Sequence, residues 1–212
     1  MIPSGERLLI GHDRSELQPK RDLESMYLAP MATLLQEHAE SHAPDRRTTL
    51  LIDIKREPDR TLDLLLPLLE PLHPFLQRVE SGRLISGPLE IVISGSRPRE
   101  RIAAMESRAL FVDGRPGDLE ADPPVELVPM ISSSMKAALG TYGLQGLDEP
   151  ALERLQALAV RTHAQGRRLR FWGHLEWPAI WQALVDAKVD HIGTDQPTTL
   201  AAWLRENDPR CR

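Results

Sequence analysis

The sequence predicts an α/β fold, a (β/α)8 TIM-type barrel that lacks its first two strands. Six apolar runs alternate with helical stretches, a pattern typical of parallel strand-and-helix units rather than of hairpins. The predicted strands are 50–55, 89–94, 109–113, 127–132, 169–172 and 191–194. A closed barrel takes eight strands and typically about 250 residues. The chain has 212 residues, so we expect one incomplete barrel domain over residues 1–212.

Helices are expected between these strands. Leucines recur at helical spacing in one of them, and others begin with a proline, which the first helical turn tolerates. The predicted helices are 60–72, 98–105, 150–164, 178–187 and 198–205. The segment 113–127 contains Gly114, Pro116, Gly117, Pro123 and Pro124, which predicts a loop or a short turn instead.

The opening segment does not read as a complete strand-and-helix unit. A short apolar run at 8–10 ends at Gly11-His12-Asp13, and a polar loop then leads to a helix predicted over 23–38. We therefore expect the two absent strands to precede this segment. An unclosed barrel leaves apolar edges exposed, which predicts poor solubility or self-association. The alternative is a doubly wound sheet, in which the strand order would reverse midway.

Composition excludes several classes of partner. The net charge of -5, with 26 basic and 31 acidic residues intermixed, provides no basic field for a nucleic acid. The longest apolar stretches, such as 64–69, are far short of the roughly 20 residues of a membrane helix. The single Cys211 cannot form an internal disulfide. Residues 1–6 do not resemble a signal peptide, and localisation stays open because an export signal could be encoded upstream.

Asp53 and Lys55 are the first candidates for chemistry, because barrel enzymes carry their catalytic groups at the carboxyl ends of strands. They stand two residues apart in Leu-Leu-Ile-Asp-Ile-Lys, so both point to one face of the strand. A structural interpretation is a buried salt bridge. The functional interpretation is a ligand for a hard cation beside an ammonium group that binds phosphate.

Three further residues, His12, Trp172 and His174, are candidates for chemistry or binding. His12 has an intrinsic pKa of about 6.5, which suits proton transfer, although a loop histidine is more often structural. Trp172 and His174 end a predicted strand, where an aromatic ring can either line a pocket or simply pack. A glycosidase would need paired carboxylates at strand ends. Asp53 and Asp113 are nominal candidates for such a pair, which makes this the weakest alternative.

Four strings occur together in order: Leu-Leu-Ile-Gly-His-Asp, Leu-Leu-Ile-Asp-Ile-Lys, Arg-Phe-Trp-Gly-His and Ile-Gly-Thr-Asp-Gln-Pro. With them the chain, from about Leu8 to Leu204, resembles the phospholipase C-like phosphodiesterase superfamily. Within it, the chain is most similar to the altered inheritance of mitochondria protein 6 group. Members of this group are relatives of glycerophosphodiester phosphodiesterases and of sphingomyelinase D.

The resemblance implies a barrel that cleaves phosphodiesters with a divalent metal, Mg²⁺ or Ca²⁺, and two histidines as general acid and base. By position, His12 matches the second histidine, Asp53 a metal ligand and Lys55 a phosphate-binding lysine. Trp172 matches an aromatic residue at the pocket mouth, with His174 beside it as a further substrate-binding candidate. The implied substrate is a small-molecule or lipid phosphodiester.

The chain departs from the family pattern at its start. The first histidine, usually followed by Asn-Asp, and the Glu-x-Asp metal pair are absent, since Glu6 is the only acid among residues 1–7. One hypothesis is therefore a metal-dependent phosphodiesterase whose given chain starts too late. The other is a non-catalytic barrel remnant that binds a phosphorylated ligand or a partner protein.

Overall fold

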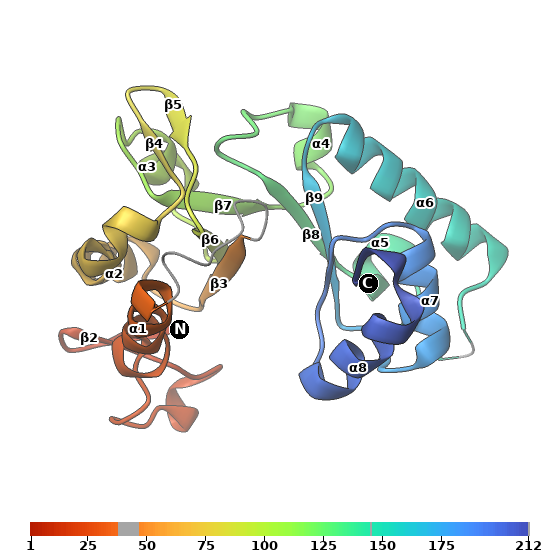
Figure 1. Cartoon of the computed structure of the whole chain (residues 1–212), viewed down its shortest axis with the longest axis horizontal. Helices are drawn as coiled ribbons and strands as arrows, with labels where there is room; N and C mark the ends of the chain where they lie inside the picture. Colours follow the sequence, from red (N-terminus) through yellow and green to blue (C-terminus); the bar gives the residue numbers. More distant parts are fainter. Residues whose placement is uncertain (38–46, 145, 212) are drawn as a thin grey trace. The chain divides into compact units, whose positions relative to one another are not determined.

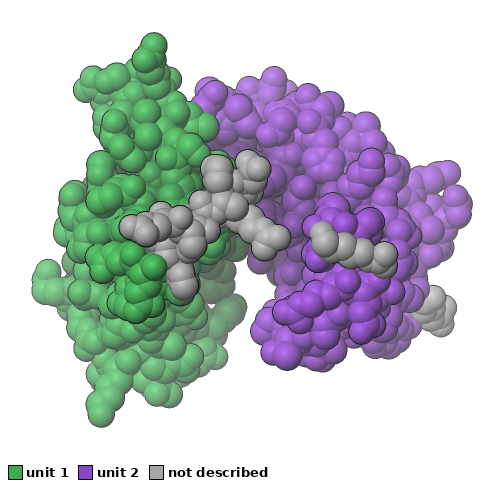
Figure 2. Space-filling model, viewed as in Figure 1, with its two compact units in different colours: residues 1–112 green, residues 113–212 purple. Residues whose placement is uncertain are grey.

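A computed structural model describes residues 1–37, 47–144 and 146–211 of the chain. The chain divides into two compact units, Met1–Val112 and Asp113–Arg212, which Figure 2 shows in green and purple. The single domain expected over residues 1–212 stays a prediction.

Six parallel strands run through the fold in chain order (Figure 1). They are β3 Thr48–Ile54, β6 Leu89–Gly95, β7 Leu110–Gly114, β8 Met130–Ser134, β9 Arg168–Trp172 and β10 His191–Ile192. Each strand pairs with the next one along this order, so the order does not reverse anywhere in the described residues. The doubly wound alternative is therefore wrong. A parallel sheet in sequential order is consistent with part of a TIM-type barrel.

Unit 1 contains β3, β6 and the first three residues of β7 in parallel pairing. Side chains alternate along β3, so that Ile52 and Ile54 are buried while Leu51 and Asp53 are half-buried on the opposite face. The register places Asp53 opposite Ser94 of β6. The polar end of β3 therefore lies beside the polar end of β6.

The helices of unit 1 are α1 Ala29–Glu37, α2 Pro58–Leu69 and α3 Arg99–Ala103. A π-helical turn at Glu24–Leu28 precedes α1, and a 3₁₀ segment at Glu70–Phe75 follows α2. The helix predicted over 23–38 thus corresponds to Glu24–Leu28 and α1, except that His38 lies outside the described residues. Leu62 and Leu65 of α2 are fully buried.

Two hairpins of unit 1 were not predicted. The first pairs β1 Ile2–Ser4 with β2 Arg7–Leu9, and the second pairs β4 Arg78–Glu80 with β5 Arg83–Ile85. Ser81 and Gly82 join β4 to β5, both with positive φ, as a type I′ turn requires. A Ser-Gly dipeptide between short apolar alternations was therefore the available signal.

Unit 2 contains the end of β7 together with β8, β9 and β10. Its helices are α4 Asp118–Ala121, α5 Met135–Leu139, α6 Glu149–Ala164, α7 Pro178–Asp186 and α8 Pro197–Asn207. A last 3₁₀ turn covers Pro209–Cys211. Asp148 caps α6 by accepting a hydrogen bond from the N–H of Ala151 at 3.0 Å, and Phe171 of β9 is fully buried. None of the helices in the described ranges is long and apolar enough to cross a membrane.

One predicted strand is displaced in the structure. The strand expected at 127–132 is β8 at Met130–Ser134, because Leu127 and Val128 belong to a turn whose N–H groups donate to Pro124 O. The buried guanidinium of Arg167 then binds the carbonyl of Val128 at 2.5 Å. Leu127 and Val128 are both buried. Their apolar character therefore reflects burial and does not indicate a strand.

Candidate functional site

Asp53 and Lys55 meet at the carboxyl end of β3. The Nζ of Lys55 lies 2.8 Å from Asp53 Oδ2, which forms the ion pair expected from their spacing. The pair is only half-buried, since 46% of the Asp53 side chain and 28% of the Lys55 side chain are exposed. Exposed ion pairs contribute little to stability. The predicted salt bridge is present, but the prediction that it is buried is wrong, because the end of β3 leaves both side chains partly exposed to solvent.

The second carboxylate oxygen of Asp53 has no partner. Oδ1 is buried and accepts no hydrogen bond in the structure. Gly95, at the end of β6, lies directly against it, because a Cβ at Gly95 would stand 2.2 Å from Oδ1 and 2.4 Å from the carbonyl oxygen of Ile54. Gly95 also has φ of 70°, a conformation that favours glycine. This contact was not predicted, because the local sequence shows nothing more than a glycine at a strand end.

His12 lies in the loop that follows β2. Its side chain is 73% exposed, and Nδ1 lies 3.3 Å from Asp13 Oδ2. The backbone N–H of His12 donates to Glu16 Oε2 at 2.7 Å, and Glu16 also closes a capping box with Asp13. The backbone of His12 is thus held while its ring faces solvent.

The loop that carries His12 is anchored at its base by Asp22. Leu9 pairs with Asp22, and Arg7 of β2 forms an ion pair with the Asp22 carboxylate. Asp22 Oδ1 accepts the N–H of Ser25 at 2.8 Å. This backbone hydrogen bond, with further contributions from the Ser25 hydroxyl and Arg7, holds the pKa of Asp22 below its usual value.

Replacing Asp22 by alanine is expected to destabilise the protein by about 1–2 kcal/mol at pH 7, because the hydrogen bond from the Ser25 N–H and the charge-assisted contact with Arg7 are lost together. The folded pKa of Asp22 is depressed, so its contribution is present above the unfolded pKa of about 3.9 and is lost as pH falls through the folded pKa. Urea unfolding from pH 7 to pH 3 measures this. Asp22→Asn keeps an acceptor for Ser25 and is the matched control. An undiminished difference at low pH would contradict the anchor.

Trp172 and His174 belong to unit 2. The Trp172 side chain is 44% exposed at the end of β9. His174 Nδ1 lies 3.0 Å from the carbonyl oxygen of Leu175, which makes Nδ1 the donor, while Nε2 is buried without a partner. Glu176, a residue missed from sequence, accepts from Thr194 Oγ1 at 2.7 Å and from the Asp195 N–H at 2.9 Å. It joins the loops after β9 and β10. The substrate-binding roles of Trp172 and His174 stay predictions.

Asp113, the nominal partner of Asp53 in a glycosidase, is fully buried in unit 2. Arg115 Nη1 lies 2.7 Å from Asp113 Oδ2 and so neutralises its charge. A glycosidase needs carboxyl groups that face the sugar. The ion pair with Arg115 therefore indicates a structural role for Asp113.

The described residues hold no group of three or more His, Cys, Asp or Glu side chains placed to bind one metal ion. Asp53 offers one oxygen, whereas Mg²⁺ and Ca²⁺ take six or more ligands, with Mg²⁺ keeping several waters. The residues of the described ranges therefore do not fit a complete metal centre. They fit one ligand of such a centre.

The strand-end acid and lysine of unit 1 and the histidine of the loop after β2 all lie in the first half of the chain. A family model described as the AIM6-like phosphodiesterase domain matches residues 2–113, which hold all three. The chain belongs to this family.

Three relatives of the chain are named altered inheritance of mitochondria protein 6 or its homolog. The chain is 28% identical to altered inheritance of mitochondria protein 6 of Eremothecium gossypii, over 91% of this chain and 58% of that protein. It is 22% identical to the Arthroderma benhamiae homolog, over 90% of this chain and 68% of that protein. The protein of the same name from Zygosaccharomyces rouxii is 24% identical over 91% of this chain and 56% of its own length. The chain thus spans a little over half of the first of these relatives. No solved structure matches the chain.

Proposed function

We propose that the protein is a metal-dependent phosphoric diester hydrolase that acts on a phospholipid or a glycerophosphodiester. The observation that carries this proposal is the half-buried Asp53–Lys55 pair, whose Asp53 Oδ1 has no partner, inside the region matched by the phosphodiesterase family. An ammonium group and an unsatisfied carboxylate oxygen at one strand end can together bind a phosphate and a cation.

Lys55, His12 and Asp53 each have a separate role in the proposed reaction. Lys55 binds a nonbridging phosphoryl oxygen and stabilises the charge that develops there. His12 protonates the alkoxide that leaves, a role that its solvent-facing imidazole ring allows. Asp53 orients Lys55 through the 2.8 Å contact and would hold a bound cation by one carboxylate oxygen.

The proposed cofactor is a divalent ion, Mg²⁺ or Ca²⁺, which would neutralise charge on the phosphoryl group. Its other ligands are not found among the described residues. The test is calorimetric titration of each ion into wild-type protein and into Asp53→Asn. Binding that disappears in the variant supports the role of Asp53, and equal binding by both proteins contradicts it.

A second candidate function is a non-catalytic domain that binds a phosphorylated ligand. Two observations favour it: Asp53 has no two further acidic or histidine ligands beside it in the described ranges, and the His12 side chain is 73% exposed, with Asp13 Oδ2 at 3.3 Å from its ring. In this case Lys55 binds the phosphate and no bond is broken.

An assay with a chromogenic phosphodiester and Mg²⁺ separates the two functions. If the protein is a hydrolase, His12→Ala is expected to lower kcat by about 100-fold or more, the usual contribution of a general acid. His73→Ala is the matched control, since the His73 side chain is also exposed, at 53%, and lies on the 3₁₀ segment after α2. Metal-dependent turnover that persists in His12→Ala contradicts the assigned role. Absence of turnover in the wild type favours the binding domain.

A further inference from the structure

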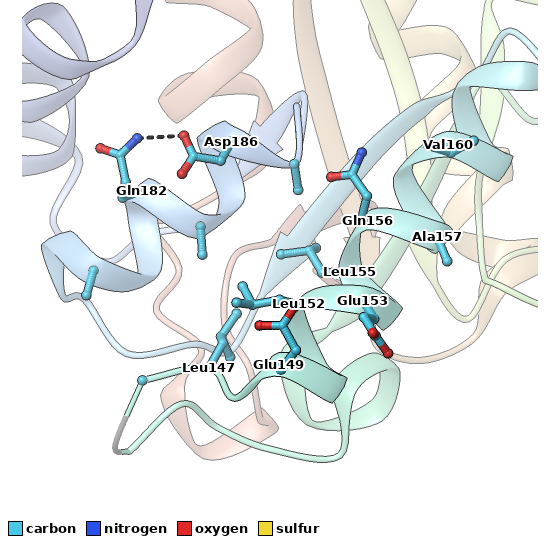
Figure 3. Close-up of a pocket in the computed structure, with 14 residues that line it drawn as sticks. Leu147, Glu149, Leu152, Glu153, Leu155, Gln156, Ala157, Val160, Gln182 and Asp186 are labelled. Atoms are coloured by element: carbon cyan, nitrogen blue, oxygen red, sulfur yellow. Dashed lines mark hydrogen bonds between the residues drawn. The ribbon is translucent and has the colours of Figure 1, made fainter.

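A groove of about 920 Å³ runs between α6 and α7 in unit 2 (Figure 3). Residues of α6 from Glu149 to Val160 form one wall, and residues of α7 from Ala179 to Asp186 form the other. At a rise of about 1.5 Å per residue, the α6 wall is about 16 Å long, which is roughly three turns of a helix. None of the residues assigned to phosphodiester chemistry lines this groove.

The floor of the groove is apolar although it is open to solvent. Leu152 and Val160 of α6 are 36% and 57% exposed, and in Figure 3 Leu152 and Leu155 extend from α6 toward α7. The facing side of α7 presents Ala179 and Ala183, four residues apart. Because alanine side chains are short, the backbone of another helix can approach α7 closely at these two positions. Exposed apolar surface of this kind marks interaction sites.

The charged residues among the described lining of the groove are all acidic. Glu149, Glu153 and Asp186 contribute three carboxylates, and none of the described lining residues is Lys or Arg. Gln182 donates to Asp186 at 2.7 Å and leaves its charge in place. An apolar floor with an acidic border is complementary to a ligand that has the opposite pattern, an apolar stripe flanked by cations.

We propose that this groove binds an amphipathic helix of a partner protein that carries Lys or Arg on both sides of its apolar stripe. Helix-in-groove recognition uses apolar anchors at i, i+3 or i+4 and i+7, a spacing that the length of the groove accommodates. A second copy of this chain does not fit, because a twofold interface through this face would oppose two sets of three carboxylates. An anionic lipid is disfavoured by the same charges.

The test uses a fluorescein-labelled synthetic peptide of about 16 residues, with leucines at i, i+3, i+4 and i+7 and lysines beside them. Fluorescence anisotropy with the full chain is expected to show saturable binding that weakens with salt. The double variant Glu149→Lys/Glu153→Lys is expected to raise Kd by about 10-fold or more. Glu120→Lys, on the exposed side of α4 outside the groove, is the matched control and is expected to bind like the wild type.

A second pair of variants tests the apolar floor. Val160→Gln is expected to raise Kd by about 5-fold, whereas Arg161→Gln, the next exposed residue of α6 and not part of the lining, leaves Kd unchanged. Circular dichroism checks that the variants fold. The proposal is overturned if a peptide with glutamates in place of the lysines binds equally well, or if a dansyl-labelled fatty acid binds and the basic peptide does not. A dimer that Val160→Gln dissociates in light scattering would also overturn it.

Discussion

Replacing Lys55 by methionine is expected to lower kcat/KM for a phosphodiester by about 100-fold or more, because the charge that stabilises the phosphoryl oxygens is lost. Methionine keeps most of the length of the side chain and removes only the ammonium group. Asp53 loses its ion-pair partner, but the pair is half-exposed, so stability should change little. The measurement is steady-state kinetics with a chromogenic phosphodiester and Mg²⁺, with the melting temperature determined in parallel.

Two further variants sharpen this prediction. Lys55→Arg retains a cation with a different geometry and is expected to recover part of the activity. Lys188→Met removes an exposed lysine of unit 2 and is the matched control. Turnover in Lys55→Met equal to that of Lys188→Met would falsify the phosphate-binding role. If the wild type shows no turnover, the same variants are compared by titration with glycerophosphocholine, and an unchanged Kd in Lys55→Met has the same meaning.

Replacing Gly95 by alanine is expected to destabilise the protein by about 3 kcal/mol or more. Part of this cost is the positive φ, which costs an alanine about 1–2 kcal/mol. The remainder is steric, because the new Cβ meets Asp53 Oδ1 at 2.2 Å and the Ile54 carbonyl oxygen at 2.4 Å. The carbonyl belongs to the β3 ladder and cannot move without breaking the pairing of β3 with β6.

Gly82→Ala separates these two contributions. Gly82 has φ of 74°, close to the 70° of Gly95, and a Cβ there meets no atom within 4 Å. Urea unfolding is expected to show a loss of about 1–2 kcal/mol for Gly82→Ala, the cost of the backbone conformation alone. Equal losses at the two positions would contradict the close packing of Gly95 against Asp53. A larger loss at Gly95 accompanied by lower ion binding would connect this contact with the candidate site.

The strands were predictable because burial leaves a local signal. Continuous apolar runs identified β3 and β6 within two residues of their observed bounds, since strands of a parallel sheet are covered on both faces. The same signal failed at Leu127 and Val128, which are buried within a turn. The two-residue periodicity of a strand also predicted that Asp53 and Lys55 lie on the same face, and their ion pair confirms this.

The sequence by itself determined the α/β class of the fold, the order of its main strands and helices, and the placement of Asp53 and Lys55 at a strand end, because each depends on residues close together in the chain. Tertiary structure decided the contacts between distant residues: Gly95 against Asp53, Arg7 on Asp22, and the acidic groove between α6 and α7. These contacts depend on strand register and on the side of each helix that meets its neighbour, which local periodicity does not specify. The first 25 residues illustrate this difference. The Gly11-His12-Asp13 motif predicted the histidine from sequence, whereas the fold was needed to show that Asp22 anchors the loop that carries it.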